Sequence, residues 1–262
     1  MEQDKKPTPP AQDKKEIPTY YLRMAVVEDI DKILDFYKAN KHHNVRDRDP
    51  DVLKERADNG SIVLIEDEDG EIVATSISYA HNVEENGVER TEWVEIGSTR
   101  IAGLNGIPGV FDLMVVAQTL RAYLVEPPED CFVAHMEHEY IQKTAERLGF
   151  RSCEPPKGLQ EVSDKTVGTA DMTDRSKDWY RMGVEGLPIM AQYMVDAWNK
   201  PTLKNKKTGE EIKISFERST MLDKFKDTIE NLAKRDYGSV DKPDLTEGIR
   251  KHRDDWLRRR FR

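Results

Sequence analysis

Apolar and polar residues alternate with two different periods between residues 19 and 153. Runs rich in β-branched and aromatic residues predict strands over 19–26, 61–67, 71–81, 87–102, 130–136 and 150–153. Apolar residues at helical spacing predict helices over 27–41, 49–60, 110–124 and 139–150. The predicted order is β, α, α, β, β, β, loop, α, β, α, β. This order indicates one mixed α/β domain of ordinary size.

The pattern changes after the pair Pro155–Pro156, which marks a domain boundary. Helical spacing then predicts a helix over 178–201 that breaks near Gly186–Pro188, and an amphipathic helix over 219–238. A strand is predicted between them, over 208–216. The predicted organisation is therefore a disordered tail over 1–18, an α/β domain over 19–156 and a mainly helical C-terminal extension over 157–262.

Composition narrows the classes of protein to consider. The chain has 262 residues, of which 35% are charged and 37% hydrophobic, and its formal net charge is −9. This charge argues against a chain that coats nucleic acid along its whole length. Two cysteines form no disulfide framework, and no apolar run approaches the roughly 18 residues that span a bilayer. We therefore expect a cytoplasmic protein with no membrane partner. The apolar face of 221–232 suggests a possible homodimer contact.

A glycine-rich stretch, GLNGIPGV at 103–110, lies between a predicted strand and a predicted helix. Glycines allow a backbone to approach phosphate oxygens closely, and a helix N-terminus favours an anion. Gly106 and Gly109 could shape such a cradle, although Pro108 has no N–H group to donate. The alternative interpretation is a turn that only reverses the chain.

The segment 20–153 resembles the GNAT superfamily of acyl-CoA-dependent N-acyltransferases. The resemblance rests on the order of elements, on AERLGF at 145–150 and on the spacing between the glycine loop and that motif. It implies a mixed sheet flanked by helices, and acetyl-CoA as co-substrate, with its pantetheine arm beside the fourth strand and its pyrophosphate at the loop. Leu104 and Ile107 depart from the family's loop motif. The implied cofactor-binding residues are Thr99, Arg100, Ile101, Gly106, Gly109 and Val110.

Glu95, early on the fourth strand, is the candidate general base, because a carboxylate there can take a proton from an amine. The alternative is a solvent-facing strand residue between Val94 and Ile96. The resemblance implies an acid on the helix after the fifth strand, but Ala145 replaces the tyrosine common in the family. His135 and Tyr140 are the candidates for proton transfer.

We assign no metal site, because the cluster HMEHE over 135–139 lacks a clear further ligand. Two hypotheses of different class follow for function. The first is transfer of an acyl group, most simply acetyl, from acyl-CoA to the amine of a small molecule or protein within a ternary complex. The second is a catalytically inactive GNAT-fold protein for assembly or nucleic-acid handling, with a phage origin among its candidate sources.

The C-terminal end supplies the motif for the second hypothesis. Seven lysine and arginine residues surround Trp256 and Phe261 within 250–262. Basic residues interleaved with aromatic ones can bind a nucleic acid or an acidic protein partner. The alternative is a solvated helix end with Trp256 docked on the body of the protein. His42 and His43, in a predicted loop, fall in a region that the resemblance places near the acceptor.

Overall fold

The structure is a computed structural model that describes residues 16–41, 49–104, 106–167, 177–205 and 207–235. The predictions for the tail at 1–15, for His42 and His43, and for the basic segment 250–262 lie outside these residues.

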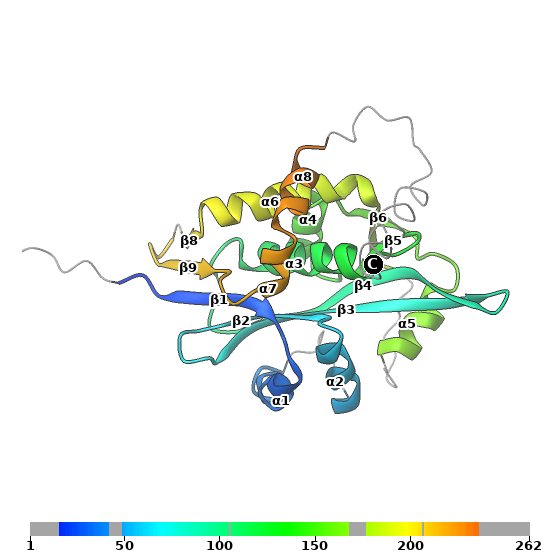
Figure 1. The fold of residues 1–262 in the computed structure, drawn as a ribbon, viewed down its shortest axis with the longest axis horizontal. Coiled ribbons are helices and arrows are strands. Elements are labelled where there is room, and N and C mark those ends of the chain that lie inside the picture. Colours follow the sequence, from blue (N-terminus) through cyan, green and yellow to red (C-terminus); the bar gives the residue numbers. More distant parts are fainter. Residues whose placement is uncertain (1–15, 42–48, 105, 168–176, 206, 236–262) are drawn as a thin grey trace, which may run out of the picture.

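One nine-stranded mixed sheet forms the centre of the molecule, in the order β6-β7-β5-β4-β3-β2-β1-β9-β8 (Figure 1). Neighbouring strands are antiparallel except at two places, where β1 pairs with β9 and β4 pairs with β5. The strands are β1 (Thr19–Met24), β2 (Ile62–Glu66), β3 (Ile72–Glu85), β4 (Val88–Ile101), β5 (Cys131–His135), β6 (Arg151–Cys153), β7 (Trp179–Met182), β8 (Thr202–Lys204) and β9 (Glu211–Ser215).

Helices cover both faces of the sheet, so the fold has three layers (Figure 1). One face carries α1 (Ile30–Ala39), α2 (Pro50–Asp58) and α5 (Leu159–Val167). The other carries α3 (Val110–Val125), α4 (Glu139–Arg147), α6 (Leu187–Asn199), α7 (Thr220–Lys224) and α8 (Lys226–Ala233). Two 3₁₀ turns, η1 (Val27–Asp29) and η2 (Val184–Gly186), lead into α1 and α6.

The central helix α3 explains why the second face holds the larger core. Fourteen of its sixteen residues are buried, because β2, β3 and β4 lie against one side of it and α6 against another. A helix that is enclosed from several sides has apolar residues all round rather than on one face, and this is the pattern of α3. In the described part of the chain, no helix is both long enough and apolar enough to cross a membrane.

The mixed α/β class and the element order predicted over 20–153 are confirmed. One prediction in the extension is wrong: residues 179–182 form strand β7 rather than the start of a helix. The reason is tertiary, because β7 pairs with β5 on one side and with β6 on the other, where Trp179 and Tyr180 fit a buried strand.

The helix predicted over 219–238 is divided in the structure at Phe225, between α7 and α8. Its apolar face is the one on which the homodimer prediction rested. Leu222, Ile229 and Leu232 are buried in the main core of the same chain, where α8 packs against α6. This chain itself therefore covers the face on which the homodimer prediction rested, and the homodimer stays a prediction.

The extension completes the sheet rather than forming a body of its own. Strand β7 lies between β5 and β6, and β9 and β8 add two strands beyond β1. The boundary predicted at residue 156 consequently does not divide the sheet.

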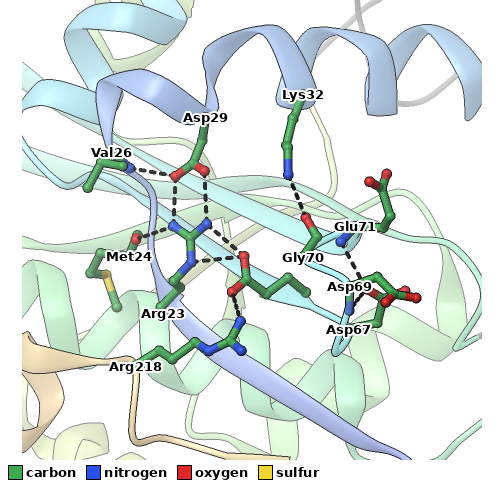
Figure 2. A network of polar contacts seen from close by, with 11 residues as sticks. Arg23, Met24, Val26, Asp29, Lys32, Asp67, Asp69, Gly70, Glu71 and Arg218 are labelled. Carbon is green, nitrogen blue, oxygen red and sulfur yellow. Dashed lines mark hydrogen bonds and ion pairs between the residues drawn. The ribbon is translucent and has the colours of Figure 1, made fainter.

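A partly buried ionic network fastens the extension to the first strands (Figure 2). The guanidinium of Arg23 donates to both carboxylate oxygens of Asp29, at 2.7 and 2.8 Å, and to Glu66 at 2.7 Å. Arg218, which follows β9, donates to the other oxygen of Glu66 and stacks 3.6 Å from the centre of the Tyr21 ring. Two arginines therefore hold one buried carboxylate between the start and the end of the described chain.

Candidate functional site

The parallel strands β4 and β5 separate at the middle of the sheet. They pair over three positions only, with Trp93 opposite Cys131, Val94 opposite Phe132 and Glu95 opposite Val133. Strand β4 then runs on to Ile101 beside β3, while β5 ends at His135 and pairs with β7. Glu95 therefore occupies the last shared position before the two strands diverge, and the following part of β4 has an edge without a β5 partner.

A bulge lies on β4 just beyond this point. The register shifts between Thr75 and Ile77 of β3, and Ser98 has a φ of 49°, an unusual value for a residue with a side chain. Two tyrosines on the α1 side hold Ser98 in place. The hydroxyl of Tyr37 donates to its carbonyl oxygen at 3.0 Å, and that of Tyr79 lies 3.0 Å from its hydroxyl. A strained residue with such fixed surroundings is typical of a functional position.

Glu95 is buried, with 6% of its surface exposed, and its side chain points to the face that carries α5. The hydroxyl of Ser163, on α5, donates to Glu95 Oε2 at 2.6 Å. His81 Nε2, from β3, lies 2.8 Å from the same oxygen. The other carboxylate oxygen, Oε1, lies 3.8 Å from the place that a β-carbon on Gly97 would take. The predicted alternative of a solvent-facing glutamate is therefore wrong.

The imidazole of His81 is completely buried, and its Nδ1 has no hydrogen-bond partner among the residues that the structure describes. A buried polar atom without a partner is unfavourable and calls for an explanation, of which a functional role is one. Glu95, His81 and Ser163 thus form a polar cluster inside an otherwise apolar region that includes Trp93, Val133 and Leu159.

The two candidates for proton transfer lie in different surroundings. Side chains alternate along β5, so His135 points to the same face as Val133, the residue paired with Glu95. Its ring packs edge-on against Trp179 at 5.4 Å, and its Nδ1 lies 3.9 Å from Glu137. Tyr140 is instead 60% exposed at the start of α4, on the opposite face of the sheet from α5. The structure brings His135, but not Tyr140, to the face of Glu95.

The three predicted cofactor residues on β4 follow the bulge. The Thr99 hydroxyl lies 2.9 Å from that of Ser76, Arg100 pairs with Thr75, and Ile101 packs against the main core. All three lie on the stretch of β4 that β5 does not cover.

The glycine loop is partly covered by the extension. Leu104 and Ile107 are buried in the main core, where Gln or Arg and Gly stand in the family's motif. The hydroxyl of Tyr193, on α6, donates to the carbonyl oxygen of Gly109 at 3.3 Å. A β-carbon on Gly109 would lie 3.2 Å from that hydroxyl and 3.3 Å from Leu203 of β8. Gly106 is exposed, and the loop ends where Val110 begins α3.

An acidic side chain lies in the first turn of α3. Asp112 is buried, and Arg147 of α4 donates to it at 3.2 Å. Burial raises the pKa of Asp112, and the charge of Arg147 opposes this rise. A carboxylate near a helix N-terminus is itself favourable, so Asp112 takes up part of the interaction that a bound phosphate would receive there.

His81 and Ser163 were not among the site residues predicted from the sequence. The turn Asn86-Gly87 could have indicated the β3–β4 hairpin, with Glu85 opposite Val88. Regular pairing from that turn would still predict the wrong partner for His81. A bulge between His81 and Asn82 shifts the register, so that His81 lies opposite Trp93. Ser163 lies on a helix whose docking depends on the whole fold, so no local signal could place it next to Glu95.

Comparison with protein-family models found no match, and neither did comparison with curated protein sequences. The search of solved structures did find matches. The loading GNATL domain of CurA from Lyngbya majuscula is 14% identical, over 62% of this chain and 96% of that domain, with a TM-score of 0.43. The GNAT-family N-acetyltransferase YhbS from Escherichia coli, in complex with CoA, is 11% identical, over 67% and 87% of the chains, with a TM-score of 0.42.

A phosphinothricin acetyltransferase of the GNAT superfamily from Sinorhizobium meliloti, in complex with AcCoA, is 16% identical, over 53% of this chain and 77% of that chain, with a TM-score of 0.39. This chain is similar in fold to these GNAT proteins.

Among the residues that the structure describes, no three His, Cys, Asp or Glu side chains form a group that could hold a metal ion.

Proposed function

We propose that the protein transfers an acyl group from acyl-CoA to an amine, with Glu95 as the general base. The observation that carries this proposal is the position of Glu95, at the last β4–β5 pair and within a buried polar cluster. Beyond Glu95, β5 does not pair with β4, and a strand edge at such a place offers backbone groups to an extended ligand such as the pantetheine arm. Acetyl-CoA is the simplest donor, and the acceptor is a small molecule or a protein carrying an amine.

In this mechanism, the neutral amine attacks the thioester carbonyl carbon, the carbon–nitrogen bond forms, and the carbon–sulfur bond breaks. Glu95 accepts the proton that the amine nitrogen loses, while the CoA thiolate leaves and takes up a proton. His81 orients the carboxylate through its 2.8 Å hydrogen bond. His135 is the better placed of the two predicted acids, since it lies on the same face.

The acceptor must reach Glu95 on the face where α5 now lies. Ser163 of α5 places its hydroxyl 2.6 Å from the carboxylate, where a polar group of the acceptor would otherwise bind. Transfer therefore requires the Ser163 hydroxyl to leave this position, by rotation of its side chain or by a shift of α5.

A transfer assay tests the proposal. The full chain is incubated with acetyl-CoA and a panel of primary amines that includes polyamines and lysine peptides, and release of the free thiol is measured. We expect acceptor-dependent thiol release that the variant Glu95→Gln loses. Equal release by the variant and the wild type would overturn the assignment of Glu95.

A second candidate function is a catalytically inactive protein that uses the same fold for assembly or for binding nucleic acid. The covering of Glu95 by α5 and of Gly109 by α6 and β8 favours it. It predicts that acetyl-CoA at millimolar concentration leaves the melting temperature unchanged, whereas a ligand at a thousandfold excess over its Kd adds about 4 kcal/mol to the stability of the native state. Salt-sensitive DNA binding that is lost when residues 250–262 are deleted would support this second function.

A further inference from the structure

A basic hollow lies on α4 and β6, and one of its lining residues, Arg147, contacts Asp112 in the first turn of α3. Its volume is ≈ 530 Å³, and its lining residues are Lys143, Glu146, Arg147 and Arg151. Three of the four are cations, and the first three follow one another along a single face of α4, at i, i+3 and i+4. The hollow therefore presents a local positive charge on a chain whose net charge is −9.

The cations of this hollow keep donors available for a ligand. Arg147 uses one terminal nitrogen for Asp112 and Thr144, and its side chain is 64% exposed. Arg151 uses Nη1 for the carbonyl oxygens of Glu146 and Phe150. Because a guanidinium carries five N–H groups, each arginine can also bind a phosphate oxygen. Lys143 pairs with Glu139 at 2.6 Å, but this pair is exposed and therefore weak.

The hollow is connected to the candidate site through a single contact. Arg147 binds Asp112, which lies in the first turn of α3, and α3 is the helix that follows the stretch of β4 with which β5 does not pair. Because α3 begins where the loop after β4 ends, a donor that extends along β4 away from Glu95 runs toward the end of α3 that Arg147 contacts. There it meets a glycine loop already contacted by Tyr193 and Leu203, with a carboxylate at the helix end.

We propose that side-chain cations of α4 and β6, rather than the backbone of the glycine loop, bind the phosphate groups of the acyl donor. This inference rests on the proposed function for the identity of the ligand. The existence of an anion site in the hollow does not depend on it. The ligand chemistry is a pyrophosphate or phosphomonoester, for which convergent arginine and lysine side chains are well suited.

Calorimetric titration of the full chain with acetyl-CoA, and separately with inorganic pyrophosphate, tests the inference. We expect Lys143→Gln and Arg151→Gln each to weaken both ligands about 5-fold, the upper range for one ion pair at an exposed site. Asp112→Asn should strengthen binding several-fold, since it removes a negative charge and releases Arg147. The matched control is Lys38→Gln, an equally exposed lysine paired with Asp35 on α1, which should change neither affinity.

The outcomes separate this inference from the proposed function. Binding of acetyl-CoA that both cation variants leave unchanged would overturn the inference and leave the proposed function standing. Binding of pyrophosphate, weakened by the variants, in a protein that does not bind acetyl-CoA would support the anion site and overturn the proposed function. Arg151 also donates to the carbonyl oxygen of Glu146 at the end of α4, so the melting temperature of Arg151→Gln is measured as a control for folding. If Arg151→Gln does not fold, the affinities of Lys143→Gln alone test the inference.

Discussion

Two buried glutamates on neighbouring parts of the sheet have opposite surroundings. Glu66, on β2, lies between the guanidinium groups of Arg23 and Arg218. Burial raises its pKa, but the hydrogen bonds and charges of the two arginines outweigh this effect, so that its pKa is lowered. Glu95, on β4, has hydrogen bonds with a serine hydroxyl and a histidine ring.

The difference indicates which carboxylate can take part in chemistry. A carboxylate held by two arginines is fixed as an anion, and it serves to join β1, β2 and the extension. A carboxylate held by a hydroxyl and an imidazole has partners that can themselves donate or accept a proton. The contrast between Glu66 as a structural residue and Glu95 as a functional one leads to three predictions, and the glycine loop supplies a fourth.

The largest expected effect is on catalysis. Glu95→Gln keeps the shape of the side chain and an oxygen that accepts from Ser163, but it removes the base. We expect the rate of acyl transfer to fall by about 100-fold or more, which is the usual contribution of general base catalysis. Affinity for acetyl-CoA should change less than twofold in a calorimetric titration. Loss of affinity and rate together would instead indicate a role of Glu95 in the structure of the site.

The next effect is on stability. Glu66→Gln leaves two arginine charges facing a neutral amide, and breaking a buried ion pair typically costs about 3–5 kcal/mol. Because Arg218 is partly exposed, we expect a loss of about 2–3 kcal/mol, measured by urea denaturation. Glu95→Gln should lose less than about 1 kcal/mol, since its partners carry no fixed charge. Equal losses of unfolding free energy in Glu66→Gln and Glu95→Gln would contradict the distinction between a structural Glu66 and a functional Glu95.

A pair of glycines tests how closely the extension packs on the loop. Gly106 and Gly109 both have a positive φ, 90° and 93°, so alanine is strained at either position. Only at Gly109 would the added β-carbon crowd Tyr193 and Leu203, whereas at Gly106 it would meet Asn205 at an ordinary 3.6 Å. We expect Gly106→Ala to lose about 1 kcal/mol. Gly109→Ala should lose measurably more, and an equal loss would show that the cover is loose in solution.

The smallest effect is the pH dependence of stability. The hydrogen bonds and charges of the arginines lower the pKa values of Asp29 and Glu66, against the opposing effect of burial. Their contribution is therefore fully present above the ordinary pKa of a carboxyl group, and it is lost as the pH falls through the lowered values. We expect the melting temperature to fall between about pH 5 and pH 3, and to fall less steeply in Glu66→Gln. Identical slopes would contradict the assigned network.

Local patterns were sufficient to predict the order of elements in the first part of the chain. The strands and the buried helix α3 carry strong periodic signals, and Glu95 could be selected from its place on the fourth strand. Tertiary pairing decided the rest. Strand β7 was predicted as a helix, because only its insertion between β5 and β6 makes Trp179–Met182 extended. His81 and Ser163 join Glu95 through a bulge and a docked helix, which no local pattern encodes.

The glycine loop is a second place where the sequence alone could not decide the function. Its sequence suggested either a phosphate cradle or a turn, and its place between β4 and α3 was predicted correctly. That Tyr193 and Leu203 lie against Gly109 depends on residues more than eighty positions away. The function of such a loop is consequently decided by what packs on it as much as by its own glycines.

Equilibrium binding of acetyl-CoA to the full chain tests the central claim most directly, because it requires no knowledge of the acceptor. We predict one site per chain with a Kd in the micromolar range, and a rise in melting temperature at millimolar acetyl-CoA that Glu95→Gln retains. No heat of binding and no rise in melting temperature at millimolar acetyl-CoA would contradict the claim that this site uses an acyl-CoA.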